Sequence, residues 1–216
     1  MEAIEHLPPG ATLVFQQVSW NQYEELLEDL AGRPGLRVSY DEGRLEITSP
    51  LSEHEEYKES ILLLVWAFAE EHGIELESRG STTWKRRKLR KGSEPDTCFY
   101  VRNAEKIIGK RKIDLESDPP PDIVVEIDTT NESLSKFPIY AALGVPEIWR
   151  YNGKHTQFYE LTGRSYTEIS ESRFLPGLTT ELLTESLDLS KTQGQRKALT
   201  AFRRRIRGRK PGSKKA

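Results

Sequence analysis

Cysteine is almost absent from this chain of 216 residues, and its scarcity excludes several classes of site. Cys98 is the only cysteine, so the chain has no internal disulfide and no zinc site built from thiolates. No apolar run reaches the roughly 20 residues of a membrane-spanning helix; the longest covers only 61–69. The N-terminal segment also lacks the basic and apolar stretches of a secretory signal. We therefore expect a cytoplasmic protein with no membrane partner.

Acidic side chains are missing from one end of the chain. Residues 191–216 contain 11 Lys or Arg and no Asp or Glu, whereas residues 1–190 contain 21 basic and 34 acidic side chains. The net charge of −2 thus hides an acidic body and a basic tail. We expect a folded domain over 1–190 and, over 191–216, a tail that is helical to about Arg207 and disordered beyond it.

The apolar pattern of the first half predicts strands beside a long helix. The stretch "LRVSYDEGRLEITSP" (36–50) alternates around a glycine-bearing turn, which is typical of a β-hairpin. A helix is expected over 53–71, with Ser52 and Glu55 as a capping box. Its stripe of His54, Ile61, Val65 and Phe68 should face the core.

The remaining pattern predicts an α/β (α+β) fold. Strands are expected within 74–84, 94–101 and 122–128, followed by a short helix over 133–144 capped by Ser135 and a meander of strands over 146–172. A helix that crosses over between strands indicates a mixed β-sheet flanked by helices. Two tryptophans, Trp66 and Trp149, are expected in the core.

Carboxylates interrupt the apolar strand "PPPDIVVEIDTT" (119–130). Side chains alternate along a strand, so Glu126 and Asp128 share the face opposite to the apolar Ile and Val side chains. Asp122 stands on the same face but at the start of the strand, where we expect it only to terminate the element. If the strand over 94–101 pairs with this one, Asp96 converges on Glu126. Hard carboxylate oxygens without thiolates favour Mg²⁺ or Mn²⁺.

Lys136 completes a candidate catalytic set. It follows Asp128 by eight residues and shares a helix face with Tyr140. Two acids that hold a divalent ion, with a lysine that orients water or stabilises charge, are suited to phosphodiester hydrolysis. Each acid taken alone is more often a cap or a solvated edge residue, so only the combined spacing predicts a site.

Two long segments, "EPDTCFYV" and "PPPDIVVEIDTTNESLSKFPIYAALGVPEIWRY", resemble the Uma-type family of bacterial restriction endonucleases, within the PD-(D/E)XK nuclease superfamily. The resemblance covers about residues 36 to 185 and includes "YDEGRLEITSPLSEH" and "RGSTTW". It implies a restriction-endonuclease-like core and divalent-metal-dependent cleavage of nucleic acid, and it makes a homodimer plausible.

By position, the resemblance makes Asp96 and Glu126 the metal-binding acids. Asp128 stands where the PD-(D/E)XK motif has its lysine. Lys136 would supply that lysine from the following helix. Asp128 would then be a further metal ligand or a partner of Lys136. His54 matches a recurrent histidine before the first long helix; it would assist at the site or be a satisfied core histidine.

Two basic stretches are candidates for nucleic-acid binding. Six of the seven residues 85–91 are basic, among them Lys85, Arg86, Arg87 and Lys88, which suits either phosphate contact or a solvated hairpin edge. The tail is the second stretch, and its basic run is Arg203, Arg204 and Arg205. It suits a nucleic-acid-binding arm, a solubilising extension or a clamp onto the acidic body.

The sequence thus predicts a metal-dependent endonuclease acting on DNA. The alternative is a catalytically inactive nucleic-acid-binding or interaction protein on the same fold, compatible with the displaced lysine and the basic tail. Hydrolysis of a substrate other than DNA by the same acids is a third hypothesis.

Overall fold

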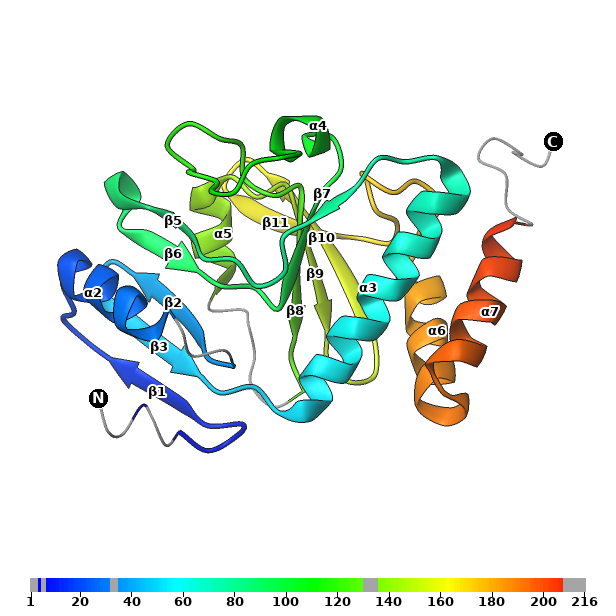
Figure 1. The fold of residues 1–216 in the computed structure, drawn as a ribbon, viewed down its shortest axis with the longest axis horizontal. Coiled ribbons are helices and arrows are strands. Elements are labelled where there is room, and N and C mark those ends of the chain that lie inside the picture. Colours follow the sequence, from blue (N-terminus) through cyan, green and yellow to red (C-terminus); the bar gives the residue numbers. More distant parts are fainter. Residues whose placement is uncertain (1–3, 5–6, 32–34, 130–135, 208–216) are drawn as a thin grey trace.

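The computed structural model describes residues 4, 7–31, 35–129 and 136–207, whose strands form two sheets (Figure 1). The first sheet is antiparallel and has the order β1-β3-β2-β6-β5. Its strands are β1 (Thr12–Phe15), β2 (Arg37–Asp41), β3 (Arg44–Thr48), β5 (Trp84–Arg86) and β6 (Lys91–Ser93). The second sheet has the order β11-β10-β9-β8-β7-β4. Its strands are β4 (Glu77–Ser78), β7 (Thr97–Tyr100), β8 (Ile123–Ile127), β9 (Glu147–Tyr151), β10 (Thr156–Thr162) and β11 (Ser165–Ile169).

The second sheet is mixed, as the sequence predicts. Strand β8 runs parallel to β9 and antiparallel to β7, and the meander of β9, β10 and β11 is antiparallel. The parallel pair requires a crossover, and helix α5 (Phe137–Leu143) lies in it. This connection returns the chain from the end of β8 to the start of β9, which places the beginning of α5 close to the end of β8.

The predicted hairpin of β2 and β3 is confirmed. Asp41 pairs with Arg44, and the two turn residues Glu42 and Gly43 both have positive φ, of 50° and 110°. This conformation matches the right-handed twist of the strands and favours glycine at the second position.

Helix α3 (Ser52–His72) matches the predicted long helix, but its start differs. Leu51 is the N-cap and makes no side-chain cap bond, so the expected capping box of Ser52 and Glu55 is wrong. Ser52 already lies inside the first turn, and Glu55 instead pairs with Arg37 of the neighbouring strand, at 3.1 Å. The helix ends as expected at Gly73, which has a left-handed φ of 63°.

The stripe of α3 that was expected to face the core is buried, but Trp66 is not. His54, Ile61, Val65 and Phe68 are all buried, whereas Trp66 is 45 % exposed. Trp66 lies about 100° around the helix from Val65, and this rotation takes it off the buried stripe. Trp149 on β9 is fully buried, as predicted.

Helices cover both faces of the second sheet. Ile123, Val125 and Ile127 of β8 pack in one cluster with side chains of α3, α6 (Thr180–Gln193) and α7 (Gln195–Arg207). Val124 points the other way and packs with α5 and the short α4 (Ala104–Ile107). Helix α2 (Trp20–Leu30) covers the first sheet through a separate aromatic and aliphatic cluster. The predicted alternation of β8 is therefore confirmed.

The segment expected to be a basic tail begins inside α6 and continues as α7. Helix α7 is helical to Arg207, as expected, and its Phe202 and Ile206 are buried in the cluster shared with α3 and α6. Residues 208–216, which the sequence predicts to be disordered, lie outside the described residues, and so does Ser135, the expected cap of α5.

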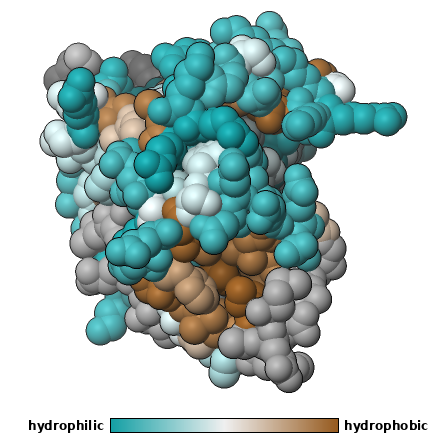
Figure 2. Space-filling view, turned by 90° about the vertical axis from the view of Figure 1, so that its left-hand side faces the viewer, coloured by the Kyte–Doolittle hydropathy of each residue, from teal (hydrophilic) through white to brown (hydrophobic). Residues whose placement is uncertain are grey.

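One face of the molecule separates hydrophilic from hydrophobic residues (Figure 2). Hydrophobic side chains gather in the lower part of this face. Strand β1 forms the edge of the first sheet and exposes Val14 and Phe15. Among the described residues, none of the helices combines the length and apolar character that crossing a bilayer requires.

Candidate active site

A small cavity of about 40 Å³, here called the central cavity, opens where the end of β8 meets the start of α3 and the end of β3. Side chains of both sheets and of two helices line it. Its lining includes all five residues that the sequence predicts for catalysis or metal binding: His54, Asp96, Glu126, Asp128 and Lys136. Arg37 and Glu46 of the first sheet also line it. The fold therefore brings the predicted set together around one space.

Strand pairing brings Asp96 to Glu126. Strands β7 and β8 are antiparallel neighbours, with Thr97 opposite Val125. The pairing extends one residue beyond β7, because the Asp96 backbone N–H donates to the Val125 carbonyl at 3.1 Å. The Asp96 carboxylate in turn accepts a hydrogen bond from the backbone N–H of Ile127, at 2.7 Å. This bond fixes Asp96 beside the residue that follows Glu126.

Helix α5 supplies two polar groups to Glu126. Lys136, the N-cap of α5, donates from Nζ to Glu126 Oε2 at 2.8 Å, and the Tyr140 hydroxyl donates to Oε1. The two residues are four positions apart and so share a helix face. The Ser93 hydroxyl donates to the Tyr140 hydroxyl at 3.1 Å, which connects α5 to the first sheet. The lysine predicted from the sequence thus contacts the predicted glutamate.

Burial and neighbouring charges shift the acid–base equilibria of this pair. The pKa of Glu126 is raised to about 7, mainly by burial. The charge of Lys136 lowers this pKa, and the charge of Asp96 raises it. For Lys136, burial lowers the pKa, but the two carboxylates of Glu126 and Asp96 outweigh this effect, so the net shift is upward. The lysine therefore keeps its proton at neutral pH, whereas the glutamate is poised between its two forms.

Asp128 has a different partner from the one the sequence suggested. It pairs with Arg150 of β9, which stands beside Glu126 in the parallel register of β8 and β9. Lys136 donates to Glu126 rather than to Asp128, and the role of Asp128 as a further metal ligand stays a prediction. Over the described ranges, no group of three or more His, Cys, Asp or Glu side chains is arranged to hold a metal ion.

The two remaining carboxylates nevertheless have the donor chemistry that Mg²⁺ uses. This ion is commonly bound by one or two carboxylates and keeps several waters, which substrate phosphates can replace. Asp96 and Glu126 are both buried beside the central cavity, and the raised pKa of Glu126 reflects in part the charge of Asp96. A bound cation would relieve this repulsion. The residues present therefore fit a divalent ion held by Asp96 and Glu126.

His54 is both a buried core residue and a residue at the site, the two alternatives that the sequence left open. It is buried on the core-facing stripe of α3, yet its ring lines the central cavity, and its Nε2 is hydrogen-bonded to the Thr129 hydroxyl. A catalytic role for His54 stays a prediction.

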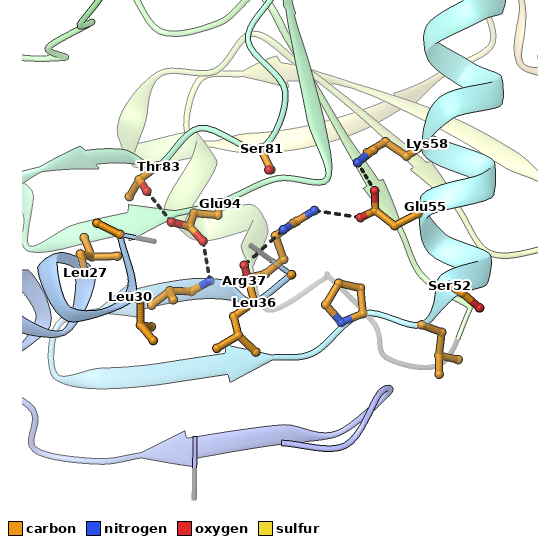
Figure 3. A pocket seen from close by; sticks show the side chains of 15 residues that line it. Leu27, Leu30, Leu36, Arg37, Ser52, Glu55, Lys58, Ser81, Thr83 and Glu94 are labelled. Atoms are coloured by element: carbon orange, nitrogen blue, oxygen red, sulfur yellow. Dashed lines mark hydrogen bonds and ion pairs between the residues drawn. The ribbon is translucent and has the colours of Figure 1, made fainter. Parts of the chain in front are cut away.

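Sequence reasoning missed Arg37, which connects the central cavity to a larger groove (Figure 3). This groove of about 620 Å³, here called the leucine groove, lies between α2 and α3 and includes Leu27, Leu30 and Leu36. Arg37 Nε lies 3.7 Å from Asp96 Oδ1, and the Arg37 guanidinium bonds Glu55 on its other side. The sequence showed that Arg37 and Val38 lie on opposite faces of a hairpin strand. It did not show that Asp96 lies beside Arg37.

The predicted nucleic-acid-binding residues of the β5–β6 hairpin contact polar groups of the chain itself. Lys85 and Arg87 share the carboxylate of Glu24, Arg86 donates to the Leu115 carbonyl at 2.7 Å, and Lys88 lies 3.9 Å from an oxygen of Glu116. These contacts match the hairpin-edge alternative, and nucleic-acid binding by this group stays a prediction.

The predicted arginines of α7 lie far from the central cavity. Arg203 pairs with Glu70 and Arg205 with Glu185, whereas Arg204 is exposed. Glu70 lies sixteen residues beyond His54 on α3, a distance of roughly 24 Å at the rise of an α-helix. The contacts match the expected clamp onto the acidic body, and binding of nucleic acid by these arginines stays a prediction.

Replacing Tyr140 by Phe tests whether its hydroxyl tunes Glu126. The hydroxyl bond lowers the pKa of Glu126, so its loss raises that pKa further and leaves less carboxylate at neutral pH. We expect the pKa of the Glu126 carboxyl, followed by NMR, to rise by about one unit, the size of one hydrogen bond to a charged group. Tyr100→Phe is the matched control, because this buried hydroxyl bonds the Pro119 carbonyl away from the site. An unchanged pKa of Glu126 in Tyr140→Phe would contradict this role of the hydroxyl.

Comparisons with known proteins agree with this geometry. The profile of the Uma2 family, described as "Putative restriction endonuclease", matches residues 20–192. A solved structure, titled as a putative nuclease belonging to DUF820 from Anabaena variabilis, is similar with a TM-score of 0.50 and 12% identity. The similarity covers 68% of this chain and 89% of that one, and supports a restriction-endonuclease-like fold. No match is found among curated proteins.

Proposed function

Since the chain belongs to the Uma2 family of restriction-endonuclease-like proteins, we propose that it is a divalent-metal-dependent endonuclease that hydrolyses DNA phosphodiester bonds. One observation carries the proposal: Lys136, Glu126 and Asp96 meet at one cavity although they come from separate elements. This combination of one buried ammonium and two buried carboxylates matches the needs of phosphodiester hydrolysis.

Each side chain has a distinct part in the proposed reaction. Asp96 and Glu126 would hold Mg²⁺ or Mn²⁺, which when bound polarises the phosphodiester and acidifies a water. Lys136 holds its proton at the cavity, where its ammonium orients the attacking water and stabilises the negative charge that develops on the phosphoryl oxygens. Tyr140 and the Ile127 backbone N–H keep the two carboxylates in place.

Nicking of supercoiled plasmid tests the proposal directly. With Mg²⁺ or Mn²⁺ we expect conversion of supercoiled to open-circular DNA, and with a chelator we expect none. The absence of nicking with every divalent ion, by protein that is folded by circular dichroism, would contradict it. Cleavage of RNA but not DNA under the same conditions would contradict the choice of substrate.

Metal binding should depend on pH because Glu126 must lose a proton to become a ligand. With a pKa of about 7, Glu126 is mostly protonated below that pH and ionised above it. We expect the affinity for Mn²⁺, measured by calorimetry, to rise up to tenfold per pH unit below about pH 7 and to level off above it. Glu126→Gln should bind weakly and lose this dependence. An affinity that stays flat across this range in the unmodified chain would contradict the assignment of Glu126.

A second candidate function is nucleic-acid binding without catalysis. The observation in its favour is that Asp128 occupies the lysine position of the PD-(D/E)XK motif and is paired with Arg150. Tight, salt-sensitive DNA binding without nicking under any metal would support this candidate over the first. Two further expectations from the sequence, a homodimer and a cytoplasmic location, stay predictions.

A further inference from the structure

Three hollows follow one another along the surface of the molecule. The central cavity, at about 40 Å³, is too small for a nucleotide, since pockets for such ligands are about 300 Å³ or more. It shares Arg37 and Pro50 with the leucine groove. The leucine groove shares Thr83 with a further pocket of about 490 Å³. Thr83 and Arg37 both line the leucine groove (Figure 3), so this groove borders the other two hollows.

The third hollow, here called the basic pocket, is lined by cations from two segments. Arg79, Lys85 and Arg87 come from the chain around β5, and Lys110, Arg111 and Lys112 come from the segment after α4. Three acids, Glu24, Asp114 and Glu116, also line it. Cations therefore exceed acids by two to one in this pocket, whereas the whole chain has a net charge of −2.

Part of this positive charge is uncompensated. Glu24 serves both Lys85 and Arg87, and Lys110 pairs with Asp118. Arg111 and Lys112 are exposed and have no acidic partner within the described part of the chain. Arg79 is engaged elsewhere, because it pairs with Glu77 and donates to the Ile107 carbonyl. A pocket with two exposed cations that lack an acidic partner is suited to a backbone phosphate.

From this arrangement we propose that the basic pocket binds backbone phosphates of the DNA strand whose cleaved phosphate lies at the central cavity. The proposal rests on the proposed function and adds a contact outside the reacting centre. The strand would follow the leucine groove, pass Thr83 and reach Arg111 and Lys112. These residues contact backbone charge, so they contribute to affinity for any sequence.

Charge reversal of the two unpaired cations tests the pocket. The double variant Arg111→Glu with Lys112→Glu changes only exposed side chains, so the fold is expected to persist. Fluorescence anisotropy with a labelled single-stranded oligonucleotide, in chelator so that no cleavage occurs, measures binding at several salt concentrations. We expect at least tenfold weaker binding at low salt, and a decrease of about 1.5 in the slope of log K against log[salt].

The matched control is Arg164→Glu with Lys106→Glu. These two residues are also exposed, lie outside the three hollows and produce the same change in charge. The control should bind almost as tightly as the unmodified chain and keep its slope. Equal weakening of both double variants would overturn the proposal, because it would show a general charge effect. Binding of inorganic phosphate that the first variant loses, with oligonucleotide binding unchanged, would also overturn it.

A cleavage measurement separates this proposal from the proposed function. If the unmodified chain cleaves DNA, the Arg111 and Lys112 variant should raise KM for a long oligonucleotide at least tenfold and leave kcat unchanged. A fall in kcat with KM unchanged would overturn the pocket as a binding site. If the unmodified chain cleaves nothing, the proposed function fails, yet the anisotropy result still decides whether the basic pocket binds a DNA strand.

Discussion

Asp96→Asn should abolish plasmid nicking, with a fall of about 10³-fold or more in rate. The substitution keeps the shape of the side chain, and the amide oxygen can still accept the bond from the Ile127 backbone N–H. It removes the negative charge of one of the two carboxylates that fit a divalent ion. Loss of one such charge in a buried site costs several kcal/mol of transition-state stabilisation, and about 4 kcal/mol corresponds to 10³-fold.

We also predict how Asp96→Asn affects the pKa of Glu126 and the free energy of unfolding. Without the charge of Asp96, the pKa of Glu126 falls, since Asp96 is one of the groups that raise it. The free energy of unfolding measured with urea should therefore change little while activity disappears, because the relieved repulsion offsets the lost interactions of Asp96 with Arg37 and Lys136. Asp188→Asn is the control, because it makes the same chemical change on an exposed residue of α6. Nicking that survives Asp96→Asn would refute the assigned site.

Lys136→Met should reduce nicking by about 10²- to 10³-fold and shift its pH dependence. The methionine fills a similar volume but removes the ammonium that bonds Glu126 Oε2. Because Lys136 lowers the pKa of Glu126, its loss raises that pKa above 7 and leaves the carboxyl protonated at neutral pH. The acidic limb of the pH–rate profile should move to higher pH.

The pH dependence of the free energy of unfolding is a second test of Lys136→Met. When the folded pKa of a carboxyl exceeds its unfolded value, the native state binds more protons, so the free energy of unfolding falls as pH rises between the two values. For Lys136→Met this window extends upward from the usual glutamate range beyond pH 7. Lys91→Met is a close control, since Lys91 is 15% exposed, against 13% for Lys136, and pairs with Asp41. If both variants keep full activity, Lys136 has no catalytic role.

The parts of the site that were predictable follow from local geometry. The alternation along β8 placed Glu126 and Asp128 on one face, and the four-residue spacing placed Lys136 and Tyr140 on one face of α5. These regularities hold whatever the strand or helix packs against. The pairing of β7 with β8, which brings Asp96 to Glu126, was a hypothesis that the structure confirms.

The parts that were missed depend on neighbours distant in the sequence. Arg150 meets Asp128 only because β9 lies parallel to β8 after the crossover, and Arg37 meets Asp96 only because the first sheet abuts the second. Likewise, the sequence showed the charge density of the β5–β6 hairpin. It did not show that Lys85 and Arg87 share Glu24 of α2 as their partner. Local patterns carry no information about these pairings.

The site also has a mechanical consequence, because it is assembled across the junction of two sheets. Arg37 belongs to the first sheet and approaches Asp96 beside the second, and the Ser93 hydroxyl of the first sheet bonds Tyr140, which holds Glu126. The two sheets also share a hydrophobic cluster, because the buried Trp84 of β5 packs with Val124 of β8 and Ile139 of α5. Heating that separates the two sheets would therefore expose Trp84 and disrupt the site in the same step.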